Sequence, residues 1–328
     1  MSDKLKTLIL VESITIVFLA YLLIFNNPNP PSALPTEEQR GLLSSRVYSG
    51  LLQPGNLLIF NLKPLQKDIE QYIKDRNINL SLYIVNLRDG VSMGIGANKE
   101  FDPASLNKLP IAIIIMRKVE LGQLTLNTKI LIKAEYLDED SGTLYRQGVN
   151  ELTVGELLHY MLVESDNTAF KTLISKVSFE EMTNLSDYLN YYNPSLESVP
   201  PSPDNNLFIV TPKSTYNLFM SLYLSTILKP ESSEYILSAL TNTSFDIKKF
   251  ANLPEEVVVA QKYGRHYTGN LKLFHSCGII YLKDSRFFYC VMTRDMDADK
   301  AQEATGEIVN KLYHYITDLK MSIKPSNS

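Results

Sequence analysis

Histidine and cysteine are scarce in this 328-residue sequence, and there is no excess of basic over acidic residues. The two cysteines, Cys277 and Cys290, and the four histidines show no spacing typical of metal ligands, so we expect no metal site. The 32 Lys and Arg residues are outnumbered by 36 Asp and Glu residues, which gives a net charge of −4. Because nucleic-acid binders normally present a basic face, we expect no nucleic-acid partner.

Repeats and low-complexity blocks are also lacking. Hydrophobic residues (45%) and charged residues (21%) occur at ordinary globular levels, which excludes wholesale disorder. The Gly94-Ile95-Gly96 segment lacks the third glycine and the strand–helix context of a phosphate-binding loop, and no cofactor is expected. The length favours two domains, or one large domain with an insertion.

One long apolar run is present, and it lies at the N-terminus. Residues 8–25 form a hydrophobic stretch that contains Glu12 and follows Lys4 and Lys6. The length is at the short end for a membrane-spanning helix, and the two lysines favour the amino end inside. Because no clear cleavage site follows, we expect residues 1–25 to be an uncleaved signal anchor, with a cleaved signal peptide as the alternative. The main domain would then be anchored to the plasma membrane and lie outside the cytoplasm.

The rest of the chain divides into a linker, one large domain and a tail. Residues 26–62 are rich in proline near their start and predict an extended tether. Residues 63–320 carry regular patterns of strands and helices, and residues 321–328 are expected to be a disordered tail.

The large domain is expected to have strands near both ends. A helix that begins near Pro64 should precede a strand over residues 80–86 and a hairpin partner over 91–96. β-branched and aromatic runs predict three late strands before a last amphipathic helix. These strands are residues 256–264, 274–282 and 286–295.

The middle of the domain reads as helical. Residues 106–122 are hydrophobic nearly all round, which is typical of a fully buried helix. We therefore predict an α+β fold in which one sheet is built from residues 63–102 and 251–320, and residues 103–250 are a helical insertion packed against it.

Three short motifs follow one another along this pattern. Ser105 and Lys108 form an S-x-x-K element, residues 165–167 read Ser-Asp-Asn, and residues 262–264 read Lys-Tyr-Gly at the end of a β-branched run. A serine is a poor nucleophile unless a base takes its proton, and a lysine held away from solvent can do so. Each motif alone also has a structural interpretation, as a helix cap or an exposed edge charge.

In this order the motifs resemble the signature of the penicillin-recognising serine enzymes, the class A β-lactamases and their relatives among D-Ala-D-Ala peptidases. The resemblance covers about residues 62–320, and the 60-residue step from Ser105 to Ser165 matches the class A layout. It implies the β-lactamase/transpeptidase-like fold, with an antiparallel sheet. It also implies a serine hydrolase that acts on β-lactams or on acyl-D-Ala-D-Ala amides of peptidoglycan stem peptides through an acyl-enzyme. We expect a monomer.

The resemblance also implies a role for each motif residue. Ser105 would attack the substrate carbonyl, Lys108 would take its proton, and Ser165 would pass a proton to the leaving nitrogen. Asn167 would bind the substrate's side-chain amide and steady Lys108. Lys262 would place positive charge near the substrate carboxylate.

The backbone at the end of the third motif would complete the site. The N–H groups of Ser105 and Arg265 would form the oxyanion hole. Gly264 would let a substrate backbone approach the strand closely.

The sequence departs from the family pattern in two places. It has no Glu-x-x-Leu-Asn element, whose glutamate activates the deacylating water, and Glu197 is the best substitute. Tyr263 stands where the family has Thr or Ser, so it should not make the same bond to a substrate carboxylate, for which Arg265 or His266 would compensate. The alternatives are therefore a D-Ala-D-Ala carboxypeptidase or slow-deacylating penicillin-binding protein, or a non-catalytic relative that binds peptidoglycan or a partner protein.

Two other features have plain interpretations. Cys277 and Cys290 lie on the arms of one predicted hairpin with its turn over residues 283–286, one diagonal apart. Two buried thiols are the expectation there, with a disulfide as the alternative. The acidic run over residues 138–140 is expected to be a solvated turn.

Overall fold

The computed structural model describes residues 61–191, 209–267, 272–283 and 285–323. The predicted anchor over residues 1–25, nearly all of the predicted linker and Glu197 lie outside these ranges. Among the described helices, none has both the length and the apolar character needed to cross a membrane.

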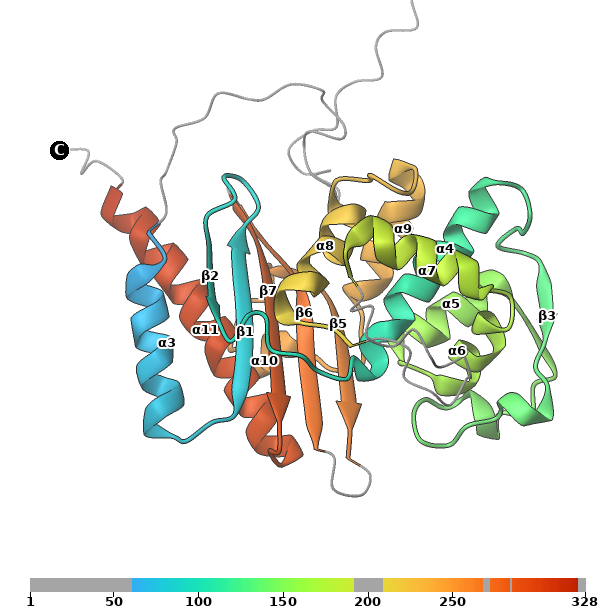
Figure 1. Cartoon of the computed structure of the whole chain (residues 1–328), viewed down its shortest axis with the longest axis horizontal. Coiled ribbons are helices and arrows are strands. Elements are labelled where there is room, and N and C mark those ends of the chain that lie inside the picture. The colour runs from blue at the N-terminus through green and yellow to red at the C-terminus, as the bar shows by residue number, and fades with distance from the viewer. Residues whose placement is uncertain (1–60, 192–208, 268–271, 284, 324–328) are drawn as a thin grey trace, which may run out of the picture. The chain divides into compact units, whose positions relative to one another are not determined.

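Strands from the two ends of the domain form one antiparallel sheet of five strands, in the order β2-β1-β7-β6-β5 (Figure 1). This confirms the predicted α+β arrangement. The neighbours β1 and β7 are about 200 residues apart in the sequence, so the sheet joins the two ends of the domain and the helical insertion lies between them in the chain. The strands are β1 (Leu80–Asn86), β2 (Ser92–Ile95), β5 (Val258–His266), β6 (Leu273–Leu282) and β7 (Ser285–Arg294).

Helices α3 (Lys63–Asp75) and α11 (Ala298–Ile323) cover one face of this sheet (Figure 1). In α3, a proline near the start supplies a preset φ, and Leu65 and Ile69 are buried one turn apart on the face toward the sheet. Burying a side chain of this kind fully stabilises the fold by about 1.5–3 kcal/mol. Helix α11 continues three residues beyond the predicted end of the domain at residue 320.

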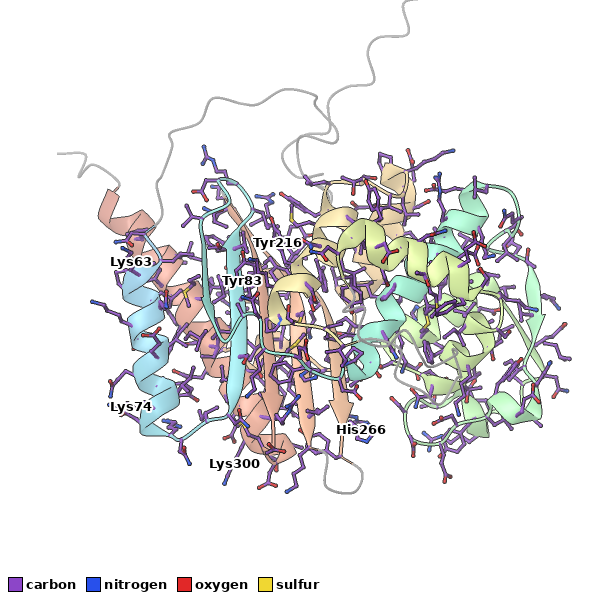
Figure 2. All side chains as sticks on the ribbon, viewed as in Figure 1. Lys63, Lys74, Tyr83, Tyr216, His266 and Lys300 are labelled. Carbon is purple, nitrogen blue, oxygen red and sulfur yellow. A yellow bond between two sulfur atoms is a disulfide. The ribbon has the colours of Figure 1, made fainter. Side chains whose placement is uncertain are left out.

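The helical part packs against the other face of the sheet and has α4 (Lys108–Glu120) at its centre. Every residue of α4 from Lys108 to Met116 is buried, as its all-round hydrophobicity predicts. Tyr216 of α8 packs edge to face on Tyr83 of β1, with ring centroids 5.9 Å apart (Figure 2). The other helices are α5 (Val154–Val163), α6 (Asn167–Ile174), α7 (Phe179–Leu189), α8 (Pro212–Tyr223), α9 (Pro230–Leu240) and α10 (Ile247–Phe250). A two-stranded sheet, β3 (Lys129–Leu131) and β4 (Glu151–Thr153), edges this part.

The hairpin of β6 and β7 differs from its prediction by one residue at the turn. Leu282 pairs with Ser285, so Cys277 lies directly opposite Cys290 rather than on a diagonal. Side chains that face each other directly across an antiparallel pair have their Cβ atoms close enough for a disulfide. The two cysteines form one, and the expectation of two buried thiols is wrong.

Candidate active site

Ser105 lies in a single 3-10 turn, η2 (Ala104–Asn107), rather than at the start of the long helix. Ala104 before it has a positive φ of 47°, and the Asp102 carboxylate accepts the Ala104 N–H at 2.7 Å. A non-glycine residue in this backbone region costs about 1–3 kcal/mol of stability, which the surrounding contacts must offset. The turn leaves Ser105 partly exposed, while Lys108 becomes the first residue of α4.

Lys108 is fully buried, and its side chain is hydrogen-bonded to Ser105, Ser165 and Asn167. Its Nζ is 3.0 Å from Ser105 Oγ, 2.7 Å from Asn167 Oδ1 and 3.3 Å from Ser165 Oγ, and it also donates to the Ser165 carbonyl. Burial lowers the pKa of Lys108 to about 7, with Arg265 acting in the same direction and the carboxylates of Asp166 and Asp138 opposing it. A substantial fraction of Lys108 is therefore neutral at physiological pH.

Lys262 contacts the same Ser165 hydroxyl as Lys108. Its Nζ donates to Ser165 Oγ at 2.8 Å and to the Tyr263 carbonyl at 3.1 Å, and the side chain is fully buried. Burial and the nearby charge of Lys108 hold the pKa of Lys262 well below its ordinary value. Ser165, whose φ is 57°, therefore has its hydroxyl between two lysine nitrogens, which suits it to pass a proton.

Asp166 fixes the loop that carries Ser165. It caps α6 by accepting the Ala169 N–H at 2.8 Å, and its other oxygen accepts the N–H groups of Thr143 and Leu144, each at 2.8 Å. The approach is so close that a side chain on Gly142 would overlap this carboxylate. The Ser-Asp-Asn motif thus serves both as a helix cap and as a support for the two residues that contact Lys108.

Asn167 connects Lys108 to a carboxylate that the sequence did not indicate. Its Oδ1 accepts from Lys108, and its Nδ2 donates to Asp138 Oδ1 at 3.1 Å. Asp138 Oδ2 lies 2.9 Å from Lys171 Nζ, and only 12% of the Asp138 side chain is exposed. The expectation that Asp138 belongs to a solvated turn is wrong, because these tertiary contacts enclose it, whereas Glu139 and Asp140 are exposed.

Gly264 places β5 directly against the Ser105 turn. A Cβ at Gly264 would be 3.0 Å from both the Ser105 nitrogen and the Pro103 oxygen, so any other residue would force the Ser105 turn to shift by a few tenths of an ångström. Arg265 is exposed at the next position, and His266 is half-buried at the end of β5 (Figure 2).

The Tyr263 hydroxyl bonds Ser244, and Lys262 Nζ lies 4.6 Å from the centre of the Tyr263 ring. Tyr263 is buried, its hydroxyl is 2.6 Å from Ser244 Oγ, and its ring packs on Phe245. The Ser244 N–H in turn donates to the Val163 carbonyl near the end of α5, at 2.9 Å. The tyrosine therefore ties β5 to the helical part.

Among the described residues, no group of three potential metal ligands is present.

These contacts bring Ser105, Lys108, Ser165, Asn167 and Lys262 together from η2, α4, the start of α6 and β5. Ser105 is bonded to the buried Lys108, and a second serine–lysine pair, Ser165 and Lys262, lies beside them. On this α+β fold, that arrangement is the one that defines the penicillin-recognising serine enzymes. The chain belongs to the beta-lactamase enzyme family, whose model matches residues 64–316.

Individual relatives are distant. β-Lactamase VEB-1 of Pseudomonas aeruginosa is 21% identical over 235 residues, which cover 67% of this chain and 79% of that protein. The solved structure of PBP-A superposes with a TM-score of 0.69 at 24% identity, over 78% of this chain and 97% of PBP-A. The TLA-1 extended-spectrum β-lactamase superposes with a TM-score of 0.68 at 21% identity, over 78% of this chain and 99% of that one. These structures share the fold with this chain.

Proposed function

We propose that this protein is a serine hydrolase that forms an acyl-enzyme on Ser105 with β-lactams or acyl-D-Ala-D-Ala amides. The observation that carries the proposal is the 3.0 Å hydrogen bond between Ser105 Oγ and the buried Nζ of Lys108. A lysine whose pKa is about 7 is neutral often enough to accept the serine proton at physiological pH. Similarity to a solved PBP-A variant, determined as an acyl-enzyme complex with penicillin G, supports the same chemistry.

The contacts suggest where each proton moves during acylation. Neutral Lys108 takes the proton of Ser105, and the Ser105 oxygen forms a bond to the substrate carbonyl carbon. When the carbon–nitrogen bond breaks, the leaving nitrogen takes a proton from Ser165, whose oxygen lies 3.3 Å from Lys108 Nζ and 2.8 Å from Lys262 Nζ. Lys108 then returns the first proton to Ser165, so no net proton is gained or lost.

Substrate binding is assigned to groups at the rim of this network. The N–H groups of Ser105 and Arg265 would hold the carbonyl oxygen as it becomes negative, a contribution of about 10²–10³ in rate per donor in comparable enzymes. The second hydrogen of Asn167 Nδ2 would bind the substrate's side-chain amide. Lys262, whose pKa is lowered by burial in the free protein, would donate a hydrogen bond toward the substrate carboxylate and become charged as that anion binds. Arg265 and His266 lie nearby on β5.

Labelling with a fluorescent penicillin tests the proposal. We expect the full-length protein to become covalently labelled and the Ser105→Ala and Lys108→Met variants to lose labelling. Ser238→Ala removes an exposed hydroxyl on α9 and serves as the matched control that keeps it. Labelling that survives in Ser105→Ala would reject the assigned nucleophile.

Slow deacylation is the second candidate, which would make the protein a penicillin-binding protein or D-Ala-D-Ala carboxypeptidase rather than a resistance enzyme. It is favoured by the missing Glu-x-x-Leu-Asn element, for which Glu197 is the proposed substitute. Nitrocefin consumed far beyond one equivalent would support a β-lactamase, with loss of turnover expected in Glu197→Gln. A stoichiometric burst, with release of D-alanine from acyl-D-Ala-D-Ala, would support the second candidate. Failure of both penicillin and acyl-D-Ala-D-Ala to acylate Ser105 would support a non-catalytic relative.

We further propose that residues 1–25 anchor a monomer in the plasma membrane with its hydrolase domain outside the cytoplasm. The proposal is supported by the apolar run over residues 8–25 and the two lysines before it. The full-length protein should then resist extraction by alkaline carbonate and be released by detergent. Release by carbonate alone would contradict an uncleaved anchor.

A further inference from the structure

Asp138 lies one side chain away from the base Lys108. Its Oδ1 accepts from Asn167 Nδ2 at 3.1 Å, and Asn167 Oδ1 accepts from Lys108 Nζ at 2.7 Å. On its other side, Asp138 Oδ2 pairs with Lys171 at 2.9 Å. The result is one continuous chain of bonds from Lys171 through Asp138, Asn167 and Lys108 to Ser105.

The segment around Asp138 is held in place by its own backbone. The Asp138 N–H donates to Thr168 Oγ1 at 3.0 Å, and the Asp140 N–H donates to Asp138 Oδ1 at 2.9 Å. Thr168 follows Asn167 directly in α6, so the carboxylate and the amide that it contacts are fixed to the same helix turn. The Asp138 carboxylate is therefore fixed by tertiary hydrogen bonds and is not a chance surface contact of Asn167.

The carboxylate decides which end of the Asn167 amide faces Lys108. A carboxylate only accepts hydrogen bonds, so it must face the NH₂ group of Asn167. The amide oxygen is thereby directed at the lysine, which is the end that a lysine N–H requires. With the amide reversed, an NH₂ group would face a group that donates, and both bonds would be lost.

We infer that Asp138 is a positioning residue that acts through Asn167 to hold Lys108 for proton abstraction from Ser105, and that Lys171 balances its charge. The inference rests on the proposed acyl-enzyme function, because it assigns Lys108 the role of base. A bond from Asn167 to a charged acceptor also strengthens the bond that the same amide accepts from Lys108.

The charges that face Lys108 among the described residues act in opposite directions. Asp166 and Asp138 favour the charged lysine, whereas Arg265 favours the neutral one. The charge of Lys108 in turn lowers the pKa of Lys262. Burial by itself raises the pKa of Asp138, but hydrogen bonds from Lys171 and Asn167 outweigh it and hold the pKa below its ordinary value. Asp138 is therefore a full negative charge at neutral pH.

Direct titration of Lys108 tests the inference without any substrate. In full-length protein labelled with ¹³C-lysine, the Cε resonance of Lys108 is assigned by its loss in Lys108→Met and followed with pH. Asp138→Asn, which keeps the shape of the side chain, should move the midpoint about 1 pH unit below that of the wild type. Lys171→Met should move it in the opposite direction, because Asp138 then acts on Lys108 without its counter-charge.

Glu139→Gln removes the same charge from the exposed neighbouring residue and should leave the midpoint unchanged. Equal midpoints in Asp138→Asn, Glu139→Gln and the wild type would overturn the inference. With substrate, the acid limb of the acylation rate should move to lower pH in Asp138→Asn, and the maximal rate should fall as Asn167 loosens. Absence of acylation in the wild type would refute the proposed function alone, since the Lys108 titration is read independently of it.

Discussion

At the scale of single residues, the buried Lys108 sets the pH dependence of the proposed chemistry. A lysine in water has a pKa of about 10.4, whereas burial lowers that of Lys108 to about 7. The unprotonated form is the one that can accept the Ser105 proton. Each pH unit below about 7 therefore removes roughly nine-tenths of the competent form.

We predict that the acylation rate falls about tenfold per pH unit below the Lys108 pKa of about 7 and levels off above it. The rate can be measured by stopped-flow mixing with nitrocefin between pH 5 and pH 9. An acylation rate that is flat from pH 5 to pH 7 would contradict Lys108 as the base.

A second residue-scale prediction concerns Gly142. Its φ is 92°, and a Cβ would overlap the Asp166 carboxylate that holds the Ser165 loop. Gly142→Ala should lower the free energy of unfolding by about 2–4 kcal/mol and slow acylation strongly, because the loop must shift. Urea denaturation and penicillin labelling measure the two effects.

Gly148→Ala is the matched control for this substitution. Gly148 also has a positive φ, of 66°, but nothing lies within 4 Å of its Cβ position. It should cost only about 1 kcal/mol and leave acylation intact. Equal effects of the two substitutions would show that backbone strain alone, and not the fixed Asp166, is responsible.

At the scale of elements, sequence patterns predicted the strands and the buried helix well but not the contacts between them. The β-branched run before Lys262 and the all-round hydrophobicity of α4 are local signals, and both elements formed where expected. The environment of Asp138 depends on α6, about 30 residues away, and an acidic run alone looks solvated. The bond between Tyr263 and Ser244 could not be predicted either, because Ser244 has no sequence signature.

The register of β6 and β7 shows how a one-residue difference at a turn changes chemistry. The turn closes between Leu282 and Ser285, which brings Cys277 and Cys290 into a direct pair. Moving the turn by one residue changes the strand pairing by two residues, so every side chain keeps its face and the alternating pattern of the sequence fits both registers.

We predict that this disulfide contributes about 2–4 kcal/mol to the free energy of unfolding, because it closes a loop in the unfolded chain between residues 13 positions apart. The double variant Cys277→Ala/Cys290→Ala should be destabilised by that amount and be insensitive to reductant. Urea denaturation with and without dithiothreitol checks both statements. Two titratable thiols in the unreduced, denatured wild type would contradict the pairing.

Tyr263 gives a further prediction at this scale. Its hydroxyl bonds Ser244 and not the site, so Tyr263→Phe should cost about 1 kcal/mol in stability and change kcat/KM by less than about threefold. Thermal denaturation and penicillin acylation kinetics measure these effects. A rise in KM of tenfold or more would indicate that the hydroxyl binds substrate after all.

At the scale of the whole molecule, the candidate site forms only when the sheet and the helical part are assembled. Ser105 and Lys108 come from the helical part, whereas Lys262 comes from a strand of the sheet, and Gly264 packs on the Ser105 turn. Two buried lysines in one network are costly, since burial favours their neutral forms. This cost falls at the site where the proposed chemistry needs a neutral lysine.

The most direct measurement is the intact mass of the full-length protein after brief exposure to benzylpenicillin, with peptide mapping of any adduct. Opening of the lactam ring adds the whole penicillin to the nucleophile, so we predict a gain of one penicillin mass, located on the peptide that contains Ser105. The adduct should be absent in Ser105→Ala. A wild-type mass that does not change at any quench time while penicillin remains intact, or an adduct on another residue, would contradict the account.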